Sequence, residues 1–115
     1  MVKRKGSYTV QENENMRGGE GVVIIEHLLT AEELYEKGRL YARIKLEPGY
    51  SIGHHVHEGE MESYHILCGE AEVSDNGELV KVSAEDTVLT ISGEGHSIKN
   101  IGNTTLELIA LILYK

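Results

Sequence analysis

Residues 49–69 read GYSIGHHVHEGEMESYHILCG, and this stretch decides the fold because two strand-like runs in it hold four of the chain's six histidines. His55 and His57 are separated by one residue, so on a strand both rings project from the same face. Glu62 follows after four residues, far enough for a tight connection to bring the next strand back beside the first. We therefore expect the two imidazoles and the carboxylate to converge.

A fourth residue of suitable chemistry, His96, lies in a later strand-like run and would complete the set when the chain closes on itself. Three imidazole nitrogens and one carboxylate oxygen bind first-row divalent metals well, and an octahedral ion keeps two further positions for water, oxygen or substrate. The sequence predicts one divalent transition metal, with Mn, Fe, Zn and Ni left open, at His55, His57, Glu62 and His96. The alternative is that these are unrelated surface or hydrogen-bonded histidines.

The rest of the chain reads as short strands divided by turn signals. Residues 39–47 alternate apolar and polar side chains, which is typical of a half-buried strand. Asp75-Asn76-Gly77 lies between two strand-like runs and predicts a β-hairpin, because primed turns need positive φ at both central residues. Counting all runs gives about eight to ten strands. We expect an all-β fold, an antiparallel β-barrel or jelly roll.

The amino end differs from the rest. Residues 1–19 are polar and end in glycine, and we interpret them as an arm that is either loosely ordered or used as an edge strand by a partner subunit. Residues 20–115 then form the barrel domain. Thr30 and Glu33 have the spacing of a capping box, which indicates a short helical turn.

Composition narrows the class of function. A chain of 115 residues suits one domain, and its formal charge of −8, with no basic run, argues against a nucleic-acid partner. No segment has the length of a membrane span or the apolar stretch of a signal peptide. Cys68 is the single cysteine, so a disulfide scaffold is excluded and a cytoplasmic location is expected. Sharing the face of Glu62, Cys68 should be a small buried thiol.

The last strand-like run, residues 104–114, is apolar on both faces. Leu108 and Ala110 lie on one face, whereas Ile109 and Leu111 lie on the other. A monomeric barrel would expose one of these faces, so we predict a homodimer that buries it. The alternative is that the arm or the helical turn covers this face within the chain.

The spacing in residues 49–69 resembles the first motif of the cupin family. That motif is a glycine, five residues, His-any-His, four residues, a glutamate, six residues and a glycine. The matching positions are Gly49, His55, His57, Glu62 and Gly69. The resemblance implies a small single-domain cupin, a double-stranded β-helix barrel whose motif residues bind one metal ion.

A second cupin motif is matched in part. Gly93, His96 and Asn100 fit it, whereas Glu85 replaces its opening glycine and Ile91 its proline. These departures concern turn residues and not ligands, so they bear on the conformation of the turn more than on the prediction of a metal site. Asn100 is expected to hold a turn or a neighbouring strand rather than touch the metal, and Gly93 to allow a backbone turn before His96.

Other side chains near the candidate ligands have competing interpretations. Tyr64 shares the face of Glu62, so its hydroxyl is a candidate catalytic group that bonds substrate or moves a proton, although a packing role is equally compatible. Alternation turns His54 and His65 away from the ligands, toward the surface or a subunit contact. His27 has no companion motif and is expected to be structural.

Two functions remain open. The first is a metal-dependent enzyme acting on a small polar or anionic metabolite, which the cupin resemblance allows as oxygenase, decarboxylase, isomerase or lyase. The second is a non-catalytic module that binds a metal or a small ligand at the same residues. Apart from Tyr64, no titratable group must face the pocket, so the sequence does not decide between them.

Overall fold

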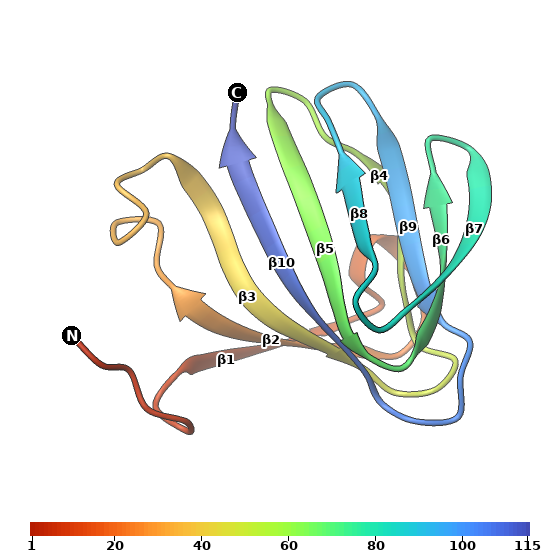
Figure 1. Ribbon diagram of the computed structural model, residues 1–115, viewed down its shortest axis with the longest axis horizontal. Coiled ribbons are helices and arrows are strands. Elements are labelled where there is room, and N and C mark those ends of the chain that lie inside the picture. The colour runs from red at the N-terminus through yellow and green to blue at the C-terminus, as the bar shows by residue number, and fades with distance from the viewer.

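The computed structural model describes residues 1–115, and its chain forms two antiparallel sheets that face each other (Figure 1). The larger sheet has six strands in the order β1-β2-β3-β10-β5-β8, and the smaller has four in the order β4-β9-β6-β7. The strands are β1 (Thr9–Glu14), β2 (Val22–Leu29), β3 (Gly38–Leu46), β4 (Ser51–Val56), β5 (Glu60–Cys68), β6 (Glu70–Asp75), β7 (Glu78–Ser83), β8 (Thr87–Thr90), β9 (Gly95–Asn100) and β10 (Leu106–Tyr114).

The core lies between the sheets and follows from alternation. On β3, Ala42, Ile44 and Leu46 are buried, and the side chains between them are half-buried on the outer face. Strand β10 is central in the larger sheet, where Ala110 is paired with Ala42 on one side and Tyr64 on the other. These residues confirm the all-β jelly roll expected from the sequence pattern.

The predicted hairpin is confirmed. Strands β6 and β7 pair from Glu70 to Ser83, and the turn between them places Asn76 at φ 50° and Gly77 at φ 94°. Positive φ at both central residues is what a type I′ turn requires, and asparagine and glycine tolerate it best.

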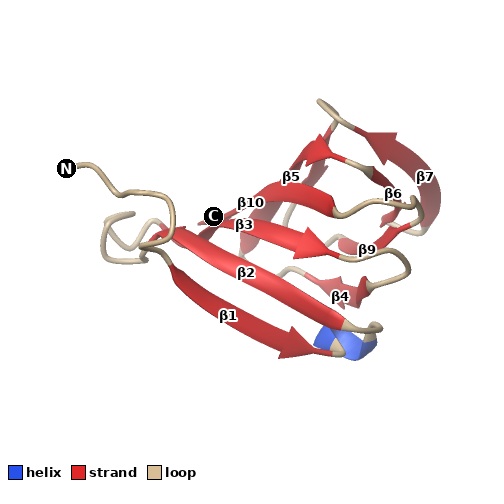
Figure 2. Ribbon diagram, turned by 90° about the horizontal axis from the view of Figure 1, so that it is seen from below, coloured by secondary structure: helices blue, strands red, loops and turns tan.

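The amino-terminal arm differs from its prediction. Residues 9–14 form β1, which pairs antiparallel with β2 of the same chain and is therefore an ordered strand; its use by a partner subunit stays a prediction. A short 3₁₀ turn, η1 (Met16–Gly18), follows β1 and lies beside β4 (Figure 2). No helix here has the length and apolar character needed to cross a bilayer.

The predicted helical turn after β2 forms its cap but no helix. Thr30 and Glu33 exchange the two capping-box hydrogen bonds, of 2.9 and 3.1 Å. One turn later Tyr35 and Glu36 adopt φ of 55° and 56°, which stops helical propagation before β3 begins at Gly38. The cap therefore closes a turn that spans residues 31–36.

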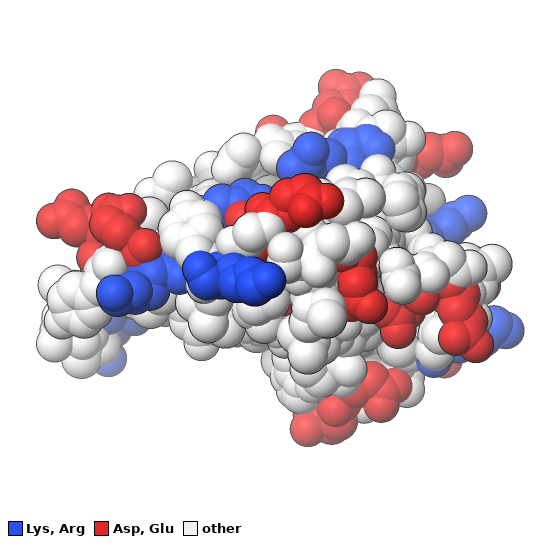
Figure 3. Space-filling view, turned by 90° about the horizontal axis from the view of Figure 1, so that it is seen from above, with Lys and Arg blue, Asp and Glu red and all other residues white.

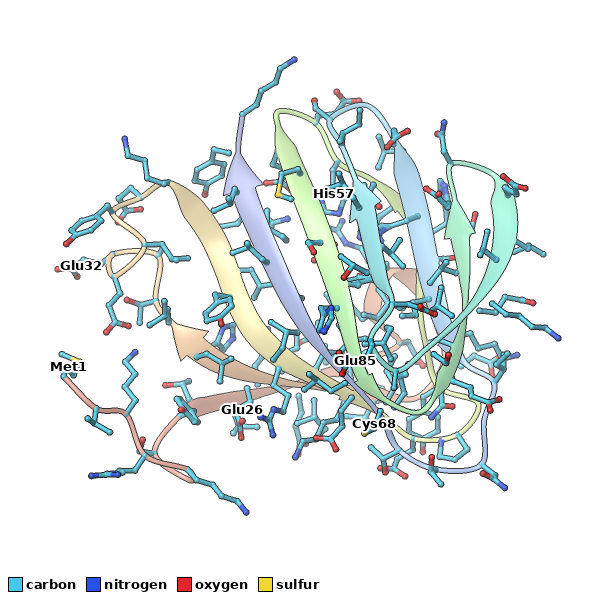
Figure 4. The ribbon with its side chains drawn as sticks, viewed as in Figure 1. Met1, Glu26, Glu32, His57, Cys68 and Glu85 are labelled. Carbon is cyan, nitrogen blue, oxygen red and sulfur yellow. The ribbon has the colours of Figure 1, made fainter.

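The prediction of a buried Cys68 is wrong, because this thiol is exposed. The register of β5 against β10 shifts at this end, with Ile66 opposite Leu108 but Cys68 opposite Glu107. Such a bulge breaks the alternation that keeps Glu62, Tyr64 and Ile66 inside. Figure 4 shows Cys68 and Glu85 near one end of the molecule and His57 near the other.

Candidate metal centre

A bulge in β4 turns His55 toward the interior, where His57 also lies. The register of β4 against β9 runs from Ile52 opposite Ile98 to His55 opposite His96, so β4 contains one extra residue between these pairs. The bulge reverses the alternation, and both Ile52 and His55 therefore face the interior, although two residues lie between them and a regular strand would turn them to opposite faces. His57 follows directly after β4 and is also buried.

The four predicted ligands come together between the two sheets. His55 and His96 are cross-strand partners in the smaller sheet, and Glu62 extends from β5 in the larger sheet. Their ligating atoms, together with that of His57, all lie within 4.8 Å of one another. His96 Nε2 lies 2.9 Å from His55 Nε2, 3.0 Å from His57 Nε2 and 2.9 Å from Glu62 Oε1.

Each imidazole is held in place by a contact at its outer nitrogen. The Nδ1 atom of His55 lies 2.8 Å from the carbonyl oxygen of Gly53, and that of His57 lies 2.8 Å from Glu60 Oε1. The Nδ1 atom of His96 lies 2.9 Å from the hydroxyl of Thr90. With Nδ1 engaged, each ring turns its Nε2 atom toward the centre of the cluster.

These contacts fix which nitrogens carry protons. A carbonyl oxygen and an ionised carboxylate only accept hydrogen bonds, so Nδ1 of His55 and of His57 must donate. In the neutral rings the Nε2 atoms then have bare lone pairs, and both face the carboxylate of Glu62. Buried acceptors that point at one another repel, and a cation at their centre would satisfy all of them.

The spacing fits a metal shell as well. Ligands bound at about 2.1 Å and at right angles around an ion lie about 3 Å apart. Four separations in the cluster are 2.9 or 3.0 Å, and the His55 to Glu62 separation is wider at 3.9 Å. The donor set and its spacing therefore suit a single divalent metal ion.

The carboxylates of the cluster are strongly acidic. Burial raises the pKa of Glu62, but hydrogen bonds from His55 and His96, in the ring form that carries a proton on Nε2, outweigh this and bring the pKa down to about 2. The Arg39 guanidinium lowers the pKa of Glu60 to about 2 as well, against a smaller opposing effect of burial. Both side chains are thus anionic near neutral pH, the form that a metal ligand and an acceptor for His57 require.

Tyr64, the candidate catalytic residue, lies on the wall of the same cavity. Its ring stacks on that of His96, with centroids 4.9 Å apart and planes inclined by 13°. Burial, together with the nearby charge of Glu62, raises the pKa of Tyr64 well above its usual value. The phenol therefore keeps its proton, so it can donate a hydrogen bond into the cavity but does not act as a base.

The remaining histidines separate into two groups. His54 is exposed, and the Nδ1 atom of His65 lies 2.8 Å from the hydroxyl of Thr87 on the outer face of the larger sheet. Both lie outside the cluster, as alternation predicted. His27 lines the cavity, and its Nε2 atom lies 3.0 Å from Gln11 Oε1 on β1, so its structural role stays a prediction.

The cavity beside the cluster has a volume of about 270 Å³ and contains residues that the sequence did not point to. Arg39 is one of them, and its guanidinium bonds both oxygens of Glu60 at 2.8 and 2.7 Å, so a chain of contacts runs from Arg39 through Glu60 to His57. Glu60 lies two residues before Glu62 on β5 and therefore on the same face of the strand. This spacing was the sequence signal that could have placed Glu60 near the cluster. Arg17, at η1, also lines the cavity and had no such signal.

Outside this cavity the charges are mixed. Figure 3 shows acidic and basic side chains interspersed over one face of the molecule, without a continuous area of one sign. The cavity beside the metal cluster contains two arginines, Arg17 and Arg39, although the formal charge of the whole chain is −8.

Comparison with known proteins gives concordant matches. A family model described as a cupin domain matches residues 42–112. The oxalate-binding protein of Thermotoga maritima is 51% identical over 113 residues, which cover 98% of this chain and 93% of that protein. The polyketide synthase protein TcmJ from the tetracenomycin system of Streptomyces glaucescens is 27% identical over 71% of this chain and 55% of its own length.

Solved structures agree with this result. A crystal structure described as a predicted oxalate decarboxylase from Thermotoga maritima superposes with a TM-score of 0.96 at 50% identity, with both chains fully covered. The KdgF structure from a Halomonas species has a TM-score of 0.75 at 14% identity, covers 97% of this chain and 92% of its own, and shows the fold alone.

Proposed function

The chain belongs to the cupin family, and from this premise we propose that it binds a small dicarboxylate such as oxalate at one divalent metal ion. His55, His57, His96 and Glu62 would hold the ion. When bound, the ion supplies a positive centre that attracts carboxylate oxygens and acts as a Lewis acid. The element among Mn, Fe, Zn and Ni is left to experiment.

The observation that carries the proposal is the inward orientation of bare acceptors. Gly53 and Glu60 each accept a hydrogen bond from the outer nitrogen of a histidine, which leaves His55 and His57 with unprotonated Nε2 atoms facing Glu62. A protein that needed these groups only for stability would give them donors. A cation satisfies this set without any change in the fold.

The class of ligand follows from the cavity and the relatives. A volume of about 270 Å³ suits a molecule of few atoms, and the cationic side chains of Arg17 and Arg39 line it together with His27. Glu62 is the one acidic residue of its lining, so an anion meets no other carboxylate there. Two descriptions of the Thermotoga maritima relatives name oxalate, as a binding protein and as a predicted decarboxylase.

The test is calorimetric titration of oxalate into protein that has been reconstituted with Mn²⁺, alongside protein stripped by a chelator. We expect binding by the loaded protein and at least a tenfold weaker interaction after stripping. Equal binding by both forms, or binding by neither, would contradict the proposal.

Metal-dependent catalysis is the second candidate, and Tyr64 favours it. A buried phenol that keeps its proton at the cavity wall can donate a hydrogen bond to a reacting anion. Incubation of the loaded protein with oxalate, followed by measurement of formate and carbon dioxide, separates the two functions. Product that disappears in Tyr64→Phe would support an enzyme with Tyr64 as a catalytic residue, and unchanged oxalate would support a binding protein.

We also propose that the chain forms a homodimer through the outer face of β10. Ile109, Leu111 and Leu113 are half-buried there, and Leu89 on nearby β8 is 53% exposed. The arm extends the sheet beside β2 instead of covering this face. Analytical ultracentrifugation should show a dimer that Leu111→Glu converts to a monomer, and a monomeric wild-type protein would refute this part.

A further inference from the structure

One arginine at the rim of the cavity has no partner in the protein. Building on the proposed function, we propose that Arg17 determines ligand specificity by binding, through its guanidinium, the carboxylate oxygens that the metal does not hold. Arg17 would thereby select a small dicarboxylate over a monocarboxylate.

Arg17 faces the same space as the metal cluster. It lines the cavity together with His55, His57 and Glu62. Its charge also reaches the interior, because it opposes, although weakly, the rise that burial and Glu62 cause in the pKa of Tyr64. A ligand bound at the cluster would therefore extend toward a positive charge.

The backbone holds Arg17 in place at some conformational expense. Its φ of 56° lies in the left-handed region, which non-glycine residues rarely adopt, and Asn15 before η1 has a φ of 52°. Such conformations persist where the surroundings fix them, and they concentrate at functional sites.

Two glycines fix this segment against β4. A Cβ atom at Gly53 would lie 2.1 Å from the Arg17 carbonyl oxygen, and one at Gly19 would lie 2.3 Å from the Ser51 carbonyl oxygen. The carbonyl of Gly53 also orients His55. The same close contact therefore positions Arg17 and one candidate metal ligand, as the adjacent placement of η1 and β4 in Figure 2 illustrates.

Arg17 is available, whereas the other cavity arginine is not. Arg39 is engaged with both oxygens of Glu60. The cations that form ion pairs with acidic side chains are Lys3, Arg39, Arg43 and Lys45. Arg17 is outside this set, and its planar fork matches a carboxylate with two parallel hydrogen bonds.

Charge balance selects the same class of ligand. Neutral histidines leave a divalent ion and Glu62 with a single net positive charge. A monocarboxylate would neutralise that charge, whereas a dicarboxylate would leave one negative charge in a largely buried site. Because Glu60 already balances Arg39, Arg17 is the residue that can compensate the second carboxylate.

The experiment compares oxalate with acetate by calorimetry, using Mn²⁺-loaded wild type, Arg17→Ala, Arg17→Lys and the matched control Arg4→Ala, which removes an exposed arginine of the arm. Metal content of every variant is measured by mass spectrometry. We expect Arg17→Ala to keep its metal and bind oxalate about 10- to 100-fold more weakly, with acetate affinity changed less than about threefold. Arg17→Lys should lie between, because it keeps the charge but loses the fork.

Two other results would overturn the inference while leaving the proposed function intact. The first is an unchanged oxalate affinity in Arg17→Ala. The second is an equal loss of oxalate and acetate affinity in Arg17→Ala together with the same loss in Arg4→Ala, which would indicate a general effect of charge. Failure of the loaded wild type to bind oxalate would instead refute the proposed function, and this inference with it.

Discussion

Two buried polar groups of this barrel, Asn100 at the end of β9 and the histidine cluster near its beginning, are satisfied in different ways. Asn100 donates from Nδ2 to the carbonyl oxygens of Leu46 and Thr104, both at 2.8 Å, and its Oδ1 accepts from the Gly102 amide at 2.9 Å. Every polar atom of that side chain thus has a partner within the protein, as predicted for a residue that holds a turn.

In the histidine cluster, by contrast, some buried polar atoms have no hydrogen-bond donor within the protein. Its outer nitrogens are engaged by Gly53, Glu60 and Thr90, whereas the Nε2 atoms of His55 and His57 are acceptors that face the Glu62 carboxylate. One site is finished by the chain itself, and the other requires a cation. The contrast indicates which buried polar groups contribute to stability alone and which contribute to function.

The largest expected effect is that of the metal on stability. If free metal exceeds its dissociation constant a thousandfold, binding to the native state alone adds about 4 kcal/mol to the free energy of unfolding. Removing the ion with a chelator should therefore lower the melting temperature, and adding metal should restore it. His57→Ala should abolish this response in a thermal-shift assay and His65→Ala should retain it, so a loss in both would overturn the assignment of His65 to the outer face.

Next in size is the cost of disturbing the complete site. Asn100→Ala removes three hydrogen bonds at a residue that is 1% exposed, and we expect a loss of about 3 kcal/mol in the free energy of unfolding. Urea denaturation measures it, with exposed Asn103→Ala as the control. Metal content should be unchanged, since Asn100 serves only the fold, and a parallel loss of metal would remove the distinction between the two sites.

A smaller effect is expected where the cluster is supported from outside. Glu60→Gln weakens the acceptor that orients His57 and removes the charge that holds Arg39. Changes to such outer contacts typically reduce metal affinity about 10- to 100-fold. Competition with a fluorescent chelator measures the affinity, and Glu58→Gln, an exposed neighbour with the same change of charge, should bind metal normally. Normal affinity in Glu60→Gln would show that His57 is oriented without Glu60.

The smallest effect concerns the turn in which the sequence departs from the cupin motif. Glu85 stands where the motif has glycine, and its φ of 77° shows that the turn keeps a conformation that glycine adopts more easily. Glu85→Gly should raise the free energy of unfolding by up to about 1 kcal/mol. Glu85→Ala keeps the Cβ atom and should give no such gain in the same denaturation experiment, so an equal gain would assign the effect to the lost charge.

Sequence alone predicted the parts that rest on spacing and periodicity. The alternation of residues 39–47, the Asn76-Gly77 turn and the four clustered side chains all follow from short-range pattern, and each has its expected place in the structure. The two-residue period of a strand was enough to separate His55 from His54.

What the sequence missed depends on long-range or irregular geometry. Strand β1 is polar because it lies at an exposed edge, so residues 9–14 have no apolar signal of a strand. Cys68 was misplaced because the bulge opposite Glu107 interrupts the alternation. Arg17 and Arg39 reach the cavity through the packing of η1 and β3, which no local pattern encodes.

The most direct test of the central claim is the metal content of untagged protein, measured by mass spectrometry beside His96→Ala. The bare nitrogens and the Glu62 carboxylate predict about one divalent ion per chain in the wild-type protein and a large loss in the variant. Absence of metal from both proteins, even after reconstitution, would contradict the account and leave a cupin barrel whose buried acceptors have another explanation.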